Sequence, residues 1–116
     1  MSEDCLFCRI VSGELPTDLL AESERSIAFR DINPQAPVHV LVVPRRHVPN
    51  VGALAAASSD DLADVFALVS QVARSEGVAE NHRVVFNTGA GAGQTIFHAH
   101  AHVLGGADFS EHGLGL

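Results

Sequence analysis

The longest regular pattern in the chain is a row of apolar residues spaced three or four positions apart. Ser58 precedes this row and Asp61 follows three positions later, which is typical of a capped helix N-terminus. Apolar side chains then recur at helical spacing at Leu62, Val65, Phe66, Val69, Val72 and Ala73. We therefore expect a long amphipathic helix over residues 59–76, which ends at Gly77.

Shorter apolar runs on both sides of this helix favour β-strands. The run VHVLVVP at residues 38–44 is rich in β-branched residues and apolar on both faces except at His39, so we expect a central strand there. A polar side chain inside such a run needs a partner. Further strands are expected within residues 17–31, as two short strands around a turn at 22–25, at residues 83–87 and at residues 95–104.

The remaining segments complete the order of elements. Residues 5–11, CLFCRIV, have apolar residues at helical spacing and precede Ser12-Gly13, so we expect a short helix. INPQAP predicts an extended or turning segment, residues 51–57 after PRRHVPN an irregular alanine-rich stretch, and TGAGAG a flexible loop. Helix, strands, long helix and strands in this order imply an α+β fold with a largely antiparallel sheet. A chain of 116 residues fits one domain, over residues 1–116.

Composition and charge narrow the class of partner. Apolar residues make up 47% of the chain, which indicates a globular protein, and no apolar run approaches the roughly 20 residues of a membrane helix. The N-terminus lacks the basic flank and apolar stretch of a secretory signal, so we expect a cytoplasmic protein with no membrane partner. The formal charge of −7 argues against polymeric nucleic acid, which normally binds a basic face.

Three histidines, His98, His100 and His102, alternate with alanine near the C-terminus. Side chains alternate across a strand, so the three imidazoles would share one face. One interpretation is surface or core histidines without a function. Another is a catalytic metal, although no Asp or Glu lies between Arg83 and Asp108 to act as its base. A third is nucleophilic attack on phosphorus, because a neutral imidazole is a competent nucleophile near pH 7.

The glycine-rich segment before the histidines fits the third interpretation. Glycines let backbone N–H groups approach an anion, and neutral side chains add hydrogen-bond donors. These residues are Gly89, Gly91 and Gly93, together with Asn87, Gln94 and Thr95. The loop alone is weak evidence, because it lacks G-K-[ST] and leads into a strand rather than a helix.

Cys5 and Cys8 are the only cysteines and form a C-x-x-C pair at the chain start. Three interpretations of this pair are open: two inert thiols, a redox pair, or half of a zinc site. A redox pair usually follows a strand in a βαβ unit, and no strand can precede Cys5 here. A zinc site needs two further ligands, which the many histidines make plausible.

Three blocks of the sequence, in this order and spacing, resemble one family. They are CLFCRIVSGELP, AFRDINPQAPVHVLVVPRRHV and VVFNTGAGAGQTIFHAHAHVLGG. HAHAHVL resembles the signature of the histidine triad (HIT) superfamily, and PQAPVHVLVVP with HVLGG is similar to its HINT branch of nucleoside phosphoramidate hydrolases. The resemblance implies a HIT-like fold of a five-stranded antiparallel sheet and two helices. It also implies a homodimer whose sheets join, with the long helix at the interface.

The resemblance implies a role for each candidate catalytic residue. His100 would attack the α-phosphorus of a purine nucleoside monophosphate derivative and become nucleotidylated. His102 would contact the phosphate and help the leaving group depart, and His39 would belong to a proton relay. Asp31 would accept hydrogen bonds from both ribose hydroxyls.

The remaining implied sites concern the base, the phosphate and a metal. A purine pocket would be lined by Leu6, Phe7, Ile10, Phe29 and Ile32. The phosphate would be held by Asn87, Gly93, Gln94 and Thr95. One structural zinc per chain would be bound by Cys5, Cys8, His47 and His98.

Two departures from the family pattern leave the substrate open. Arg30 stands where some relatives have histidine, and the tail ADFSEHGLGL lacks the aromatic ending of eukaryotic HINT proteins. His82 and His112 match no motif and are expected at the surface. The alternatives to an adenosine 5′-phosphoramidase-like hydrolase are a dinucleoside polyphosphate hydrolase and a nucleotide- or zinc-binding adaptor with negligible turnover.

Overall fold

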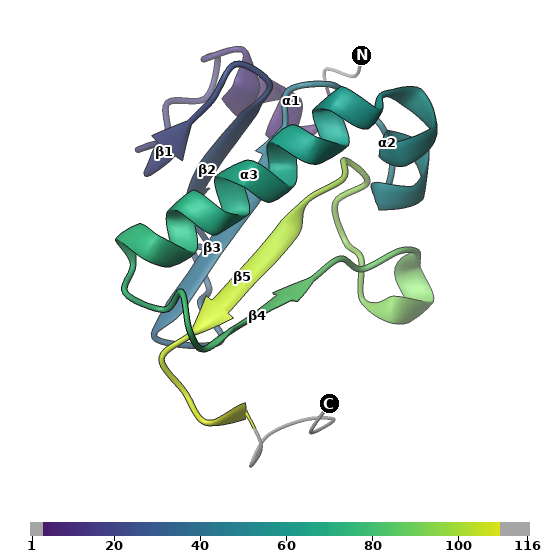
Figure 1. The fold of residues 1–116 in the computed structure, drawn as a ribbon. Helices are drawn as coiled ribbons and strands as arrows, with labels where there is room; N and C mark the ends of the chain where they lie inside the picture. The colour runs from purple at the N-terminus through teal and green to yellow at the C-terminus, as the bar shows by residue number, and fades with distance from the viewer. Residues whose placement is uncertain (1–3, 110–116) are drawn as a thin grey trace.

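The computed structural model describes residues 4–109, which form one antiparallel sheet with helices on its two faces (Figure 1). The strands, in spatial order, are β1 (Ala21–Glu22), β2 (Ser26–Arg30), β3 (Val38–Pro44), β5 (Ala101–Gly105) and β4 (His82–Val85). Each neighbouring pair is antiparallel. The expected α+β class and five-stranded antiparallel sheet are confirmed, with β3 at the centre.

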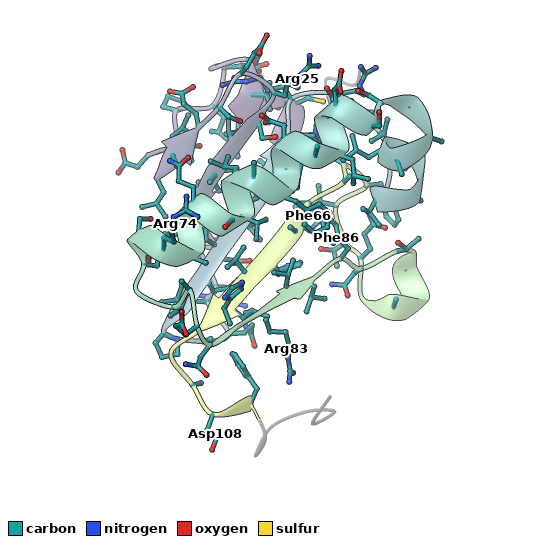
Figure 2. All side chains as sticks on the ribbon, in the orientation of Figure 1. Arg25, Phe66, Arg74, Arg83, Phe86 and Asp108 are labelled. Atoms are coloured by element: carbon teal, nitrogen blue, oxygen red, sulfur yellow. The ribbon has the colours of Figure 1, made fainter. Side chains whose placement is uncertain are left out.

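The long helix α3 (Ser59–Ser75) crosses one face of the sheet (Figure 1). The Oγ of Ser58 accepts a hydrogen bond from the N–H of Asp61 at 3.0 Å, which is the predicted cap. The side chains that α3 buries against the sheet are Val65, Leu68, Val69, Val72 and Ala73. Phe66 was expected on this apolar face, but it is 48% exposed and packs beside Phe86 at 5.6 Å between ring centroids (Figure 2).

The other face of the sheet carries the short helix α1 (Leu6–Val11). Phe7 from α1 is buried and packs edge to face on Phe29 of β2, with ring centroids 5.6 Å apart. Leu41 and Val43 of β3 join this second core. Because neighbouring residues of β3 point to opposite faces, this strand contributes to both cores.

A third α-helix, α2 (Val51–Ala57), occupies the segment that we expected to be irregular. Asn50 caps it, since its Oδ1 accepts a hydrogen bond from the N–H of Ala53 at 2.9 Å. The glycine segment expected as a flexible loop also contains one 3₁₀ turn, η1 (Ala90–Ala92). Both segments therefore contain regular hydrogen-bonded structure that their alanine- and glycine-rich composition did not indicate.

The last strand is shorter than expected. β5 begins at Ala101, so His98 and His100 lie in the irregular segment before it. That segment bonds to another part of the chain, because the N–H of Ala99 donates to the carbonyl of Val48 at 2.8 Å. Within residues 4–109, no helix is long and apolar enough to cross a membrane.

One buried carboxylate joins α3 to residues that flank β2 and β3. Asp61, 5% exposed in the first turn of α3, accepts hydrogen bonds from Arg25 Nη1 at 2.8 Å and from Arg46 Nε at 2.6 Å. The hydrogen bond from Arg46 contributes most to lowering the pKa of Asp61 from its ordinary value of 3.8. The charged form of Asp61 therefore stabilises the packing of α3.

We predict that Asp61→Asn lowers the free energy of unfolding by roughly 1–2 kcal/mol at pH 7, because it removes two charge-assisted hydrogen bonds. A folded-state pKa below the unfolded value gives stability that is present above pH 3.8 and is lost as the pH falls further. The difference between wild type and variant should therefore shrink below that pH in urea titrations. Asp60→Asn, an exposed change in the same helical turn, is the control, and equal losses in both variants would contradict this account.

Candidate active site and metal site

The pairing of β3 with β5 brings two histidines together on the face opposite α3. Leu41 lies opposite His102 in this pairing, and His39 lies opposite Leu104. His39 and His102 are thus diagonal neighbours on one face, with His39 Nε2 2.9 Å from His102 Nδ1. The polar residue inside the apolar run of β3 therefore has its partner on the adjacent strand.

Four side chains from separate parts of the chain form a compact cluster, the Cys₂His₂ cluster of Cys5, Cys8, His47 and His98. Their ligand atoms all lie within 4.8 Å of one another. The Nδ1 atoms of His47 and His98 are 3.2 Å apart, and sulfur–nitrogen distances are 3.1, 3.4 and 3.6 Å. Tetrahedral zinc with ordinary bond lengths would place such atoms about 3.3–3.6 Å apart. The geometry is therefore compatible with one metal ion.

Local structure positions each member of this cluster. Cys5 is the N-cap of α1, and its Sγ accepts a hydrogen bond from the N–H of Cys8 at 3.3 Å. His47 follows β3, and His98 precedes β5. The cluster thus joins the N-terminal helix to segments that flank the two central strands.

His98 is completely buried, and its ring is held in one tautomer. Its Nε2 donates to the carbonyl of Pro44 at 2.7 Å, so Nδ1 carries the lone pair that faces the cluster. Burial is the largest cause that lowers the pKa of His98 to about 4, so the ring is neutral at pH 7. The Nδ1 lone pair of this neutral imidazole faces two thiols and another imidazole, so it is suitably placed to coordinate a metal ion.

His100 points to a different site from its neighbour. Its Nδ1 donates to the backbone carbonyl of His98 at 2.8 Å, so the lone pair lies on Nε2. The rings of Phe7 and His100 have a T-shaped contact with centroids 5.0 Å apart, and Phe7 makes a similar contact with His98 at 5.9 Å. Burial lowers the pKa of His100 below its ordinary value, which keeps the nucleophilic neutral form at pH 7.

His102 lies beside His100, with ring centroids 4.9 Å apart. Burial is again the largest cause that lowers the pKa of His102 to about 4. On its far side, Nδ1 contacts His39, whose own Nδ1 accepts a hydrogen bond from the N–H of Gln35 at 3.0 Å. Gln35 is a contact that sequence spacing did not reveal, because it acts through its backbone.

A second group of possible ligands, Asp31, His39 and His102, also lies within 4.8 Å. Its hydrogen bonds differ from those of the Cys₂His₂ cluster. Since Gln35 donates to His39 Nδ1, the neutral ring carries its hydrogen on Nε2, the atom that faces the other two residues. That atom donates a hydrogen bond to His102 Nδ1 and has no lone pair for a metal, so this group is not arranged to ligate one.

The expected purine-pocket residues fall into two environments. Phe7 and Phe29 are buried in the core under α1, and Ile10 packs partly against them. Leu6 is 40% exposed and Ile32 is fully exposed. The two exposed side chains are therefore available to a ligand, whereas Phe7 packs against the rings of His98 and His100 and Phe29 packs against Phe7.

The expected phosphate loop is bonded mostly to itself. Backbone N–H groups of Ala92, Gly93 and Gln94 donate to carbonyls within the loop. The buried Gln94 accepts from the N–H of Gly89 through Oε1 and donates through Nε2 to the carbonyls of Pro49 and Ile96. Gly93 and Gln94 thus shape the loop, while Asn87 is partly exposed and Thr95 is exposed.

Three further residues were singled out by sequence. Arg30 forms a bidentate pair with Glu76, at 2.7 and 3.0 Å, and so fastens β2 to the end of α3. His82 is exposed, as expected, and its Nδ1 donates to the carbonyl of Val78 at 2.8 Å. His112 lies outside the described residues.

Comparison with known proteins identifies the family. The family model of the HIT domain matches residues 12–109. The chain belongs to the HIT domain family. Among solved structures, this HIT domain is similar to a HIT family hydrolase from Clostridium thermocellum, with a TM-score of 0.88, 45% identity and coverage of 93% of this chain and 95% of the other.

Two more relatives extend this comparison. A HIT family hydrolase from Legionella pneumophila has a TM-score of 0.86 and 39% identity, with 91% and 96% of the two chains covered. The purine nucleoside phosphoramidase of Escherichia coli is 36% identical over 107 residues, which cover 91% of this chain and 90% of the relative. The family expected from the three sequence blocks is thereby confirmed.

Proposed function

We propose that this HIT protein is a nucleotidyl hydrolase or transferase that cleaves a phosphorus–nitrogen bond in a purine nucleoside 5′-phosphoramidate. The observation that carries the proposal is the hydrogen bond from His100 Nδ1 to the carbonyl of His98. It leaves the lone pair of a neutral imidazole on Nε2, where it can attack phosphorus. Similarity to a relative named purine nucleoside phosphoramidase supports this choice of substrate.

The reaction proceeds in two displacements at the α-phosphorus. Nε2 of His100 forms a bond to phosphorus as the phosphorus–nitrogen bond breaks and the amine leaves. Water then attacks the nucleotidyl-histidine, restores His100 and gives the nucleoside monophosphate. Overall, one water supplies the oxygen on phosphorus and the protons that the amine and phosphate require.

Neighbouring residues orient the substrate in this proposal. His102 contacts the phosphate and supports departure of the amine, and His39 holds His102. Asp31 accepts hydrogen bonds from the ribose hydroxyls. Asn87 and Thr95 offer neutral donors to the phosphate, while Gly93 and Gln94 set the shape of the loop.

The Cys₂His₂ cluster binds one structural zinc in this proposal. Two thiolates and two neutral imidazoles are a donor set that zinc prefers, and four protein ligands leave no open position for substrate. Such an ion contributes folding energy by fastening α1 to the segment before β5. Zinc therefore has no chemical role in the reaction and sets the position of His98.

A homodimer is also part of the proposal, and the edge of the sheet supports it. β4 is the edge strand next to β5, so one side of it has no neighbour within the described sheet. Phe66 of α3 exposes half of its side chain near this edge, beside Phe86 (Figure 2). An unpaired strand edge with adjacent apolar surface is suited to a second copy of the chain.

His100→Ala should lower turnover of adenosine 5′-phosphoramidate by at least about a thousandfold, as expected when a covalent nucleophile is removed. Wild-type protein, denatured rapidly during turnover, should carry the mass of one nucleotidyl group on the peptide that contains His100. His82→Ala, which removes an exposed histidine of β4, serves as the control. Equal turnover by wild type and His100→Ala would refute the nucleophile.

The same assay separates the alternative functions. Faster hydrolysis of a dinucleoside polyphosphate than of the phosphoramidate would identify a dinucleoside polyphosphate hydrolase. Binding of adenosine monophosphate without turnover or a nucleotidyl adduct would identify an adaptor.

Protein purified without chelators should contain about one zinc per chain by elemental analysis, as expected for a closed four-ligand site. Cys8→Ser should lower this below about a tenth of an equivalent and reduce the midpoint of thermal unfolding, because the link between α1 and His98 is lost. His82→Ala should retain the metal. Wild-type protein with less than about a tenth of an equivalent would contradict the zinc site.

A further inference from the structure

His39 is held between two groups that select the same tautomer. Its side chain is only 4% exposed, so both ring nitrogens need partners within the protein. The backbone N–H of Gln35 reaches Nδ1 at 3.0 Å, which makes Nδ1 an acceptor. The hydrogen of the neutral ring must therefore lie on Nε2.

Asp31 favours the same placement of the hydrogen from the other side of the ring. Its Oδ2 is 3.5 Å from His39 Nε2, and its Oδ1 accepts a hydrogen bond from the N–H of Asn33 at 2.8 Å. The hydrogen bond from Asn33 closes an Asx turn, which holds the carboxylate of Asp31 in front of His39. A negative charge near Nε2 stabilises a hydrogen at that atom.

The tautomer of His39 determines that of His102. With a hydrogen on Nε2, His39 donates to His102 Nδ1 across 2.9 Å. The Nδ1 atom of a neutral His102 is then an acceptor, so its hydrogen lies on Nε2. Burial supports the neutral form, because it lowers the pKa of His102 to about 4.

We propose that Asp31 and the backbone amide of Gln35 are positioning groups that lock His39, and through it His102, so that His102 presents an Nε2–H donor to the phosphoryl group. His39 is then a fixed donor and not a proton carrier, because loss of its Nε2 hydrogen would leave an imidazolate. His102 stabilises charge on the phosphoryl oxygens by donating a hydrogen bond. This inference rests on the proposed function for its substrate, but the tautomers do not depend on it.

Asp31 consequently has two tasks in the reaction. Each carboxylate oxygen has two lone pairs, so Asp31 can accept from ribose hydroxyls while it faces His39 and Asn33. A substrate without ribose hydroxyls loses the first task but keeps the second. Removing the charge of Asp31 should therefore lower kcat even for a substrate whose sugar it cannot recognise.

The tautomers are measured directly by long-range ¹H–¹⁵N correlation spectra of histidine side chains in the substrate-free protein loaded with zinc. The expected result is a hydrogen on Nε2 in both His39 and His102 at pH 7. A hydrogen on Nδ1 of His102, or a doubly protonated His102, would overturn the proposal. This measurement needs no turnover, so it stands apart from failure of the proposed function.

Two substitutions at Gln35 test the amide. Gln35→Pro removes the N–H and should give a mixture of tautomers at His39 and His102, whereas Gln35→Ala keeps the N–H and should keep the wild-type spectrum. A folded Gln35→Pro protein with wild-type tautomers would refute the role of the amide. If this variant does not fold, the spectrum of Asp31→Asn tests the lock instead, with loss of the single tautomer expected and an unchanged spectrum contradicting it.

Kinetics separate positioning from ribose recognition. With a 2′,3′-dideoxynucleoside phosphoramidate, Asp31→Asn should lower kcat at least about tenfold, as expected for loss of the negative charge that favours a hydrogen on His39 Nε2. An unchanged kcat, with only the ribose substrate affected through KM, would show that Asp31 serves the sugar alone and would overturn its positioning role. Wild-type protein inactive on both substrates would refute the proposed function and leave the spectroscopic result to decide the lock.

Discussion

The hydrogen bond from His100 to the backbone carbonyl of His98 links the two sites of this molecule. It fixes which nitrogen of His100 carries the lone pair. The ring of His98 faces the Cys₂His₂ cluster, whereas the ring of His100 lies beside His102. The side chain of His98 is in turn fixed by its bond to the carbonyl of Pro44. Backbone carbonyls therefore set the tautomers of both rings, which allows the proposed metal ligand and the proposed nucleophile to lie two residues apart in the sequence with different roles.

The sheet supplies the frame for this arrangement. β3 contributes His39 and β5 contributes His102, so the pairing of these strands sets the distance between the two rings, while His100 directly precedes β5. Packing of α3 on one face leaves the opposite face to α1 and the histidines. The ring of Phe7 packs against the rings of both His98 and His100, so the position of α1 influences where these two imidazoles lie.

Much of the fold followed from periodicity and capping. The apolar run of β3 and the capped repeat of α3 are long patterns. Tertiary packing buries most of the apolar positions that these patterns predicted, so local and tertiary preferences agree. α2 was missed because alanine-rich residues 51–57 have no clear apolar face, although Asn50 is a sound cap. The length of β5 was overestimated because alternation of side chains does not show which backbone groups pair, and Ala99 pairs with Val48 outside the sheet.

In the candidate site, too, the sequence indicated the side chains but not the backbone contacts that hold them. Residue types and family resemblance placed the histidines and cysteines in groups that the structure brings together, as at the Cys₂His₂ cluster. The contacts that assign tautomers come from the backbone of Pro44, His98 and Gln35, and backbone groups carry no residue-specific signal. The self-bonded loop around Gln94 was hidden for a similar reason, since glycine content indicates freedom of the backbone but not its partners.

The central claim is that three alternating histidines are divided between a metal and a phosphorus atom. A crystal structure with bound nucleoside monophosphate, and with anomalous scattering measured at the zinc edge, tests it most directly. The account predicts a zinc peak bonded to Nδ1 of His98 together with Cys5, Cys8 and His47, and an α-phosphorus facing Nε2 of His100. A metal bound by His39 and His102, or His98 turned toward the nucleotide, would contradict it.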